Sequence, residues 1–179
     1  MRRWLSCFLV AVITCCVGLT GVLTPAPAEA ATKSWLDPKG DAAQHRHDMR
    51  RIVLGNTPDG VTLRVKVRAL RPASRPQVMA FMLRLPIAEL GFVARVVRRG
   101  DGTLVTRLNR NDGTGQPEYV PCPLRSRWGL RTDVISMRIE QACLSDEPES
   151  VVANVAIGWG TGLADEPSDN SRVVIVRYD

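Results

Sequence analysis

The sequence predicts an all-β protein, a two-sheet antiparallel β-sandwich of about eight strands with almost no helix. Three observations support this prediction. Val61, Leu63, Val65 and Val67 alternate with polar residues, which is the period of a strand with one buried face. Turn signals separate many short apolar runs, and only 86–90 looks helical, for a single turn. This pattern is typical of a jelly-roll or immunoglobulin-like sandwich.

The strands are expected in order along the chain, each bounded by turn residues. Asp59-Gly60 precedes the alternating run at 61–68, and Asp101-Gly102 lies between two further runs. Because Asp-Gly supplies the positive φ that short hairpin turns need, we expect a hairpin there. The eight expected strands are Met49–Leu54, Val61–Arg68, Val78–Leu85, Phe92–Arg98, Thr103–Asn109, Val134–Glu140, Val151–Trp159 and Arg172–Tyr178.

The first thirty residues have the pattern of an export signal. Arg2 and Arg3 precede an apolar run, and Ala28-x-Ala30 matches the small residues that signal peptidase reads. We therefore expect cleavage after Ala30, a secreted protein, and a single domain at 31–179. No membrane span is expected after cleavage.

Cysteine usage agrees with export. The expected mature chain keeps only Cys122 and Cys143, and in an oxidising compartment this pair most simply forms a disulfide. A metal site at these cysteines would need histidines or further cysteines at ligand spacing, which neither position has.

Positive charge is concentrated in the middle of the chain. The segment from Arg46 to Arg138 holds 18 basic and seven acidic residues, whereas 140–179 holds eight acidic residues and two arginines. Such a field favours anionic partners, for example a cell-wall polymer or lipid headgroups. The simpler interpretation is that arginines alternating with apolar residues are the solvated faces of strands, and we expect no specific nucleic-acid partner.

The opening stretch of the mature chain resembles a known family. Its residues are Trp35-Leu36-Asp37-Pro38-Lys39-Gly40-Asp41, then Asp48-Met49-Arg50-Arg51-Ile52, then the strand from Gly60. They resemble the start of DOMON-like and related carbohydrate-binding β-sandwich modules, and the chain is similar to small secreted actinobacterial proteins of unassigned function. The resemblance implies a sandwich with a structural calcium. The resemblance also suggests haem binding, because some DOMON modules bind haem through a methionine and a histidine. Met79, Met82 and Met137 lie in apolar strand patterns, however, so core packing is the better account.

The aspartates of this stretch predict a calcium site. Asp37, Asp41 and Asp48 are the proposed ligands, with Asp165 and Asp169 as partners from the acidic segment 164–170. Calcium takes six to eight oxygens from carboxylates and carbonyls, and a Pro/Gly turn can present both. The alternative, that Asp37 and Asp41 only cap a turn, stays open.

The common catalytic motifs are absent. The sequence has no Gly-x-Ser-x-Gly and no His-Glu-x-x-His, and nothing pairs its glutamates at a glycosidase spacing. His45 and His47 would form a transition-metal site only if a third ligand joined them, and we expect them to be solvated. For sugar binding, Trp128 and Tyr119 on a long loop at 111–128 are the expected ligand residues, whereas Trp159 fits an apolar strand.

These observations favour a secreted, non-catalytic binding or structural module whose partner is a glycan or an anionic cell-envelope polymer. The alternative is a secreted enzyme or redox accessory protein, using haem or a metal, with a site that no motif reveals.

Overall fold

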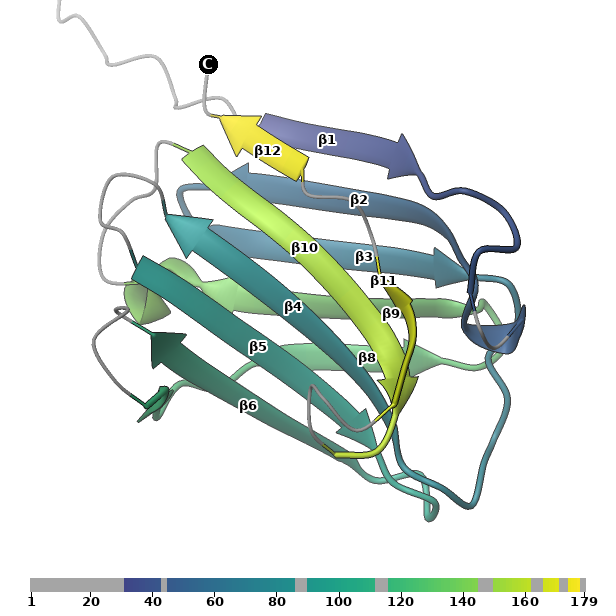
Figure 1. Cartoon of the computed structure of the whole chain (residues 1–179). Helices are drawn as coiled ribbons and strands as arrows, with labels where there is room; N and C mark the ends of the chain where they lie inside the picture. The colour runs from purple at the N-terminus through teal and green to yellow at the C-terminus, as the bar shows by residue number, and fades with distance from the viewer. Residues whose placement is uncertain are drawn as a thin grey trace, which may run out of the picture.

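Two antiparallel sheets face each other across an apolar core (Figure 1). The computed structural model describes residues 31–42, 45–85, 90–111, 116–144, 150–161, 166–170 and 174–177. The expected signal segment 1–30 and residues 86–89 of the expected helical turn at 86–90 lie outside them, whereas Leu90 is the first residue of a strand. The prediction of a two-sheet β-sandwich is confirmed.

The first sheet, sheet A, has five strands. Its strand order is β1-β2-β3-β9-β8. The bounds are β1 (Ala31–Leu36), β2 (Met49–Thr57), β3 (Gly60–Val67), β8 (Arg125–Gly129) and β9 (Val134–Glu140).

The second sheet, sheet B, has seven strands. The order is β11-β10-β4-β5-β6-β7, and β12 also pairs with β10. The bounds are β4 (Gln77–Leu85), β5 (Leu90–Arg98), β6 (Leu104–Asn111), β7 (Glu118–Val120), β10 (Ser150–Trp159), β11 (Glu166–Asn170) and β12 (Val174–Arg177). Two short 3₁₀ turns, η1 (His45–His47) and η2 (Gln141–Cys143), complete the described elements.

All eight expected strands are present, and four more were not expected. β1 lies in the opening stretch, β7 and β8 lie in what the sequence suggested was one long loop, and β11 lies in the acidic segment. These four are edge or near-edge strands, and none has more than six residues. Their alternation is too brief to stand out in the sequence.

The alternating apolar residues of β3 face the core, as their period of two predicted. Val61, Leu63, Val65 and Val67 of β3 are fully buried, and Arg64 and Lys66 are exposed. The Asp-Gly hairpin between β5 and β6 is also confirmed. Gly102 has a φ of 91°, and its N–H donates to the Arg99 carbonyl at 2.9 Å.

The chain passes from one sheet to the other after β3, after β7 and after β9, and the first and last of these crossings connect strands that are paired in each sheet. β3 pairs with β9 in sheet A, and their successors β4 and β10 pair in sheet B. β12 runs along the edge where the sheets meet, paired with β10 and in contact with β1 and β2 (Figure 1). The first and last described strands, β1 and β12, therefore lie together, as the calcium hypothesis requires of the two segments that hold its aspartates.

Candidate functional site

Three aspartates from distant parts of the chain meet at one end of the sandwich. Asp37 follows β1, Asp41 follows the turn at Gly40, and Asp169 belongs to β11. One carboxylate oxygen from each lies within 4.8 Å of the other two. Asp37 and Asp169 are buried and Asp41 is exposed, so the cluster opens to solvent on one side. The sequence predicted all three as ligands of one ion.

Asp169 also joins the two sheets. Its Oδ2 accepts a hydrogen bond of 2.6 Å from the Met49 N–H, at the first residue of β2. β11 is an edge strand of sheet B and β2 belongs to sheet A. This bond is one of the contacts that bring the acidic segment against the opening stretch.

Asp48, the other ligand predicted from the opening stretch, lies outside this cluster. Its two carboxylate oxygens accept hydrogen bonds from the Gly40 N–H at 3.2 and 3.3 Å, and Oδ2 lies 2.7 Å from the Arg50 guanidinium. Asp48 is fully buried, so its charge needs this pairing. Gly40 has a φ of 84°, which glycine adopts without strain. Asp48 therefore caps the turn at Gly40. Asp165 lies outside the described residues.

The carboxylate oxygens of the cluster are the kind of ligand that a hard cation such as calcium prefers. Two oxygens bound to one calcium ion at roughly 2.4 Å can be at most about 4.8 Å apart, so the spacing of these carboxylates fits a shared ion. Two ionised carboxylates at this distance repel each other by about 3 kcal/mol at an effective dielectric constant of 20. A divalent cation would replace that repulsion with attraction, and carbonyls and water would complete the six to eight ligands.

A second polar group closes the same end of the sandwich. His47 in η1 is fully buried, its ring centroid lies 4.8 Å from that of Trp159, and its Nε2 lies 3.1 Å from Gln77 Nε2. Burial, together with the charge of Arg46, lowers the pKa of His47 to about 4. The expectation that both histidines are solvated was therefore wrong for His47, since its ring packs inward against Trp159. The side chain of His45 is outside the described structure.

The aromatic residues lie differently from the prediction. Trp128 belongs to β8, is only 8% exposed and packs into the core. The expectation that Trp128 presents its ring to a ligand was therefore wrong. Trp159 is similarly buried at 9%. Tyr119 on β7 is 53% exposed, and the Arg107 guanidinium carbon lies 5.2 Å from its ring centroid.

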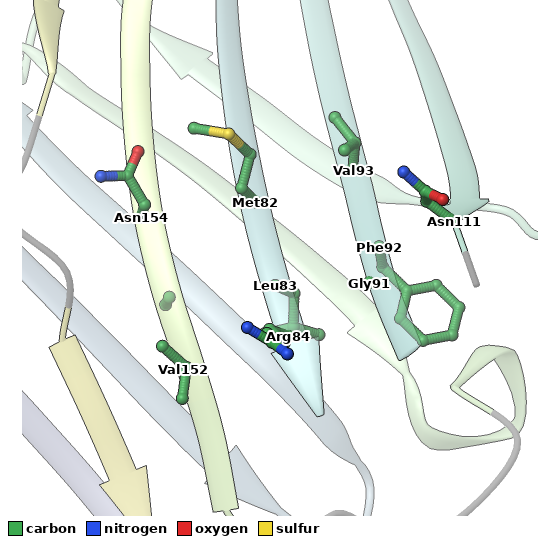
Figure 2. Close-up of a pocket in the computed structure, with 10 residues that line it drawn as sticks. Met82, Leu83, Arg84, Gly91, Phe92, Val93, Asn111, Val152 and Asn154 are labelled. Atoms are coloured by element: carbon green, nitrogen blue, oxygen red, sulfur yellow. The ribbon is translucent and has the colours of Figure 1, made fainter. Parts of the chain in front are cut away.

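The outer face of sheet B contains a groove that the sequence analysis missed. Its volume is about 400 Å³, and it crosses β10, β4, β5 and the end of β6 (Figure 2). Met82 and Val93 contribute apolar surface, and Asn154 and Asn111 lie on either side. The alternation of β4 contained a signal, because Phe81 and Leu83 point into the core and Met82 must point outward. Core packing was therefore the wrong expectation for Met82, whereas Met79 and Met137 are core residues as expected.

Cys122 and Cys143 lie at disulfide distance, as predicted. Their Cα atoms are 5.9 Å apart, and 21 positions separate them in sequence. Cys122 precedes β8 and Cys143 ends η2, so the pair ties the entry of one strand of sheet A to the segment that leaves the neighbouring strand.

Comparison with family models, with curated proteins and with solved structures found no match to this chain. Within the described residues, no helix has the length and apolar character needed to cross a bilayer.

Proposed function

We propose that this protein is a secreted, non-catalytic β-sandwich module that is stabilised by calcium and that binds a glycan or an anionic polymer of the cell envelope. The convergence of Asp37, Asp41 and Asp169 supports this proposal. Two of these carboxylates are buried, and burying like charges together is costly unless a cation compensates them. The cluster joins the opening stretch to β11, so an ion there would hold the start of the mature chain against its end.

Calcium has a structural role in this proposal. The ion would be bound by carboxylate oxygens of Asp37, Asp41 and Asp169, and it would favour the folded state because the three residues are brought together only by folding. Of the three, Asp41 is the exposed ligand, so it can be changed with least disturbance to the core.

Calcium binding can be tested by thermal unfolding of the secreted protein in 10 mM calcium and in chelator. With an extracellular-type dissociation constant near 10⁻⁴ M, calcium should add roughly 2.7 kcal/mol to the free energy of unfolding. That increment corresponds to a rise in melting temperature of about 5 to 10 °C for a domain of this size. Asp41→Asn should remove most of the rise.

Asp101→Asn is the matched control, because Asp101 is an exposed turn residue with the same charge. It should keep the full calcium-dependent rise. If calcium does not shift the melting temperature of the wild-type protein, the cluster is part of the loop structure only and the calcium component of the proposal falls.

A further inference from the structure

Four arginines lie in two rows on the outer face of sheet A. The strand register places Arg64 of β3 opposite Ser136 of β9, and Ser136 opposite Arg127 of β8. Thr62, Arg138 and Arg125 form the next row in the same way. Residues paired in this manner point to the same side of a sheet. In Figure 1 these strands form the rear layer, so the face is turned away from the viewer.

The arginines surround a shallow groove of about 290 Å³. Ser136 lies between Arg64 and Arg127, and Thr62 lies at the β3 end of the row that Arg138 and Arg125 continue. Because adjacent strands are about 4.8 Å apart, the backbones of Arg64 and Arg127 are separated by roughly 10 Å, with Ser136 between them. The groove therefore offers guanidinium groups at its sides and small hydroxyl donors along its floor.

The positive charge of this face is only partly balanced. Arg125 lies 3.0 Å from Glu140, and Arg138 lies 3.8 Å from Asp59, which is 81% exposed. Exposed ion pairs of this kind are weak and are readily exchanged for another anion. Arg64 and Arg127 form no ion pair with any carboxylate in the described part of the chain. Two exposed guanidinium groups thus remain available to a ligand.

The same face lacks aromatic surface within the described strands. The tryptophans of sheet A are Trp35 and Trp128, and both pack toward the core. Neutral sugars and unpaired bases are usually held by stacking on aromatic rings, which this face does not offer. Recognition here must rely on charge and on hydrogen bonds, and guanidinium groups pair well with carboxylates and phosphates.

We infer that the outer face of sheet A binds an anionic polysaccharide. In this inference, which rests on the proposed function and specifies its partner, Arg64 and Arg127 pair with carboxylate or phosphate groups along the polymer. The hydroxyls of Thr62 and Ser136 contact its sugar hydroxyls. Arg125 and Arg138 exchange their exposed carboxylate partners for the ligand.

The test is the affinity of the secreted protein for four polymers at low salt. They are polygalacturonate, which carries carboxylates, a teichoic acid, which carries phosphodiesters, neutral dextran, and duplex DNA. We expect binding to polygalacturonate or to the teichoic acid, with the stronger of the two identifying the anionic group, and no binding to dextran. Arg64→Gln combined with Arg127→Gln should weaken the binding by at least about tenfold, since each change removes a charge-assisted hydrogen bond.

Arg71→Gln combined with Arg99→Gln is the matched control. Both residues are exposed and lie in the β3–β4 and β5–β6 connections, and the net charge falls by the same amount as in the groove variant. This control should bind within about twofold of wild type, because its changes lie outside the groove, whereas a general loss of two charges would weaken both variants alike. The inference is overturned if both double variants lose affinity equally, if no anionic polysaccharide binds, or if duplex DNA binds more tightly than either polysaccharide.

The inference and the proposed function can fail separately. If the wild-type protein binds a polysaccharide and the Arg64/Arg127 variant binds it equally well, the polymer does not bind in this groove, but the proposal of a binding module is retained. If the groove variant loses binding but calcium shifts no melting temperature, only the calcium component is wrong. Unchanged melting temperatures of the variants show that lost binding is not lost folding.

Discussion

The two ends of the sandwich are closed by different chemistry. At one end η2 follows Glu140, which pairs with Gly60 beside the β2–β3 turn, and there Cys143 meets Cys122. At the opposite end, where β2 begins, His47 packs on Trp159, and Asp169 bonds the Met49 N–H. A covalent link responds only to reductant. The other end carries the titratable His47 and the proposed calcium ligands, so pH and calcium should affect the two ends differently.

The largest expected effect tests whether the His47 end is as well packed as the core. Trp159 and Trp128 are equally buried, so each change to alanine should lower the free energy of unfolding by about 3 to 5 kcal/mol. The sequence predicted instead that Trp128 lies on a ligand-binding loop, where the same change would cost little stability. Urea unfolding of the two variants measures both values, and Tyr119→Ala on the exposed ring should cost less than 1 kcal/mol.

A small loss for Trp159→Ala alone would mean that the His47 end is loosely packed and contributes little to the stability of the sandwich. A small loss for Trp128→Ala alone would instead restore the earlier interpretation of this residue as a surface aromatic.

These tryptophans also show how far the sequence could lead. The eight expected strands and the sandwich followed from apolar runs separated by turn signals, since a period of two over six or more residues, as in β3, is hard to produce otherwise. Trp128 was misplaced because β8 has only five residues, between a proline-containing segment and a turn, and so looked like a loop. Burial on such a short strand is decided by pairing with β9, which no local pattern reveals.

The candidate sites divide in the same way. Asp37, Asp41 and Asp169 were predictable because acidic residues clustered at both termini, and the sandwich brings the termini together. Asp48 was indistinguishable from them in sequence, and only the adjacent Arg50 and the position of Gly40 separate it. The arginine rows on sheet A were read as solvated strand faces, because the β3–β9–β8 pairing that aligns them is not visible along the chain.

The next effect in size concerns the covalent end. Replacing Cys122 and Cys143 together by alanine should cost about 3 kcal/mol, the chain-entropy value for a loop of roughly 20 residues. Because the pair lies far from the His47 end, the calcium-dependent rise in melting temperature should be unchanged in this variant. Calorimetric or optical melting with calcium and with chelator measures both quantities in one series.

The state of the cysteines is checked by intact mass. After the expected cleavage, which removes Cys7, Cys15 and Cys16, the protein should take up no alkyl group before reduction and two after it. Uptake of two groups without reduction would show that both cysteines are free thiols. The two ends of the sandwich would then not differ by a covalent link.

The smallest expected effect isolates His47. Its pKa is lowered to about 4 in the folded protein because the ring is buried, with Arg46 adding to the shift, whereas the unfolded chain titrates near 6.5. Between these values the unfolded state binds more protons at this residue, so the contribution of His47 to stability is constant above about pH 6.5 and is lost as the pH is lowered toward 4. At pH 4.5 the loss should be roughly 2.5 kcal/mol.

His47→Gln cannot titrate, so its free energy of unfolding should fall by that much less between pH 7 and pH 4.5 in urea titrations. The aspartates near Met49 are present in both proteins, so the difference between the two pH profiles belongs to His47. Identical profiles would show that protonation of His47 does not destabilise this end of the sandwich.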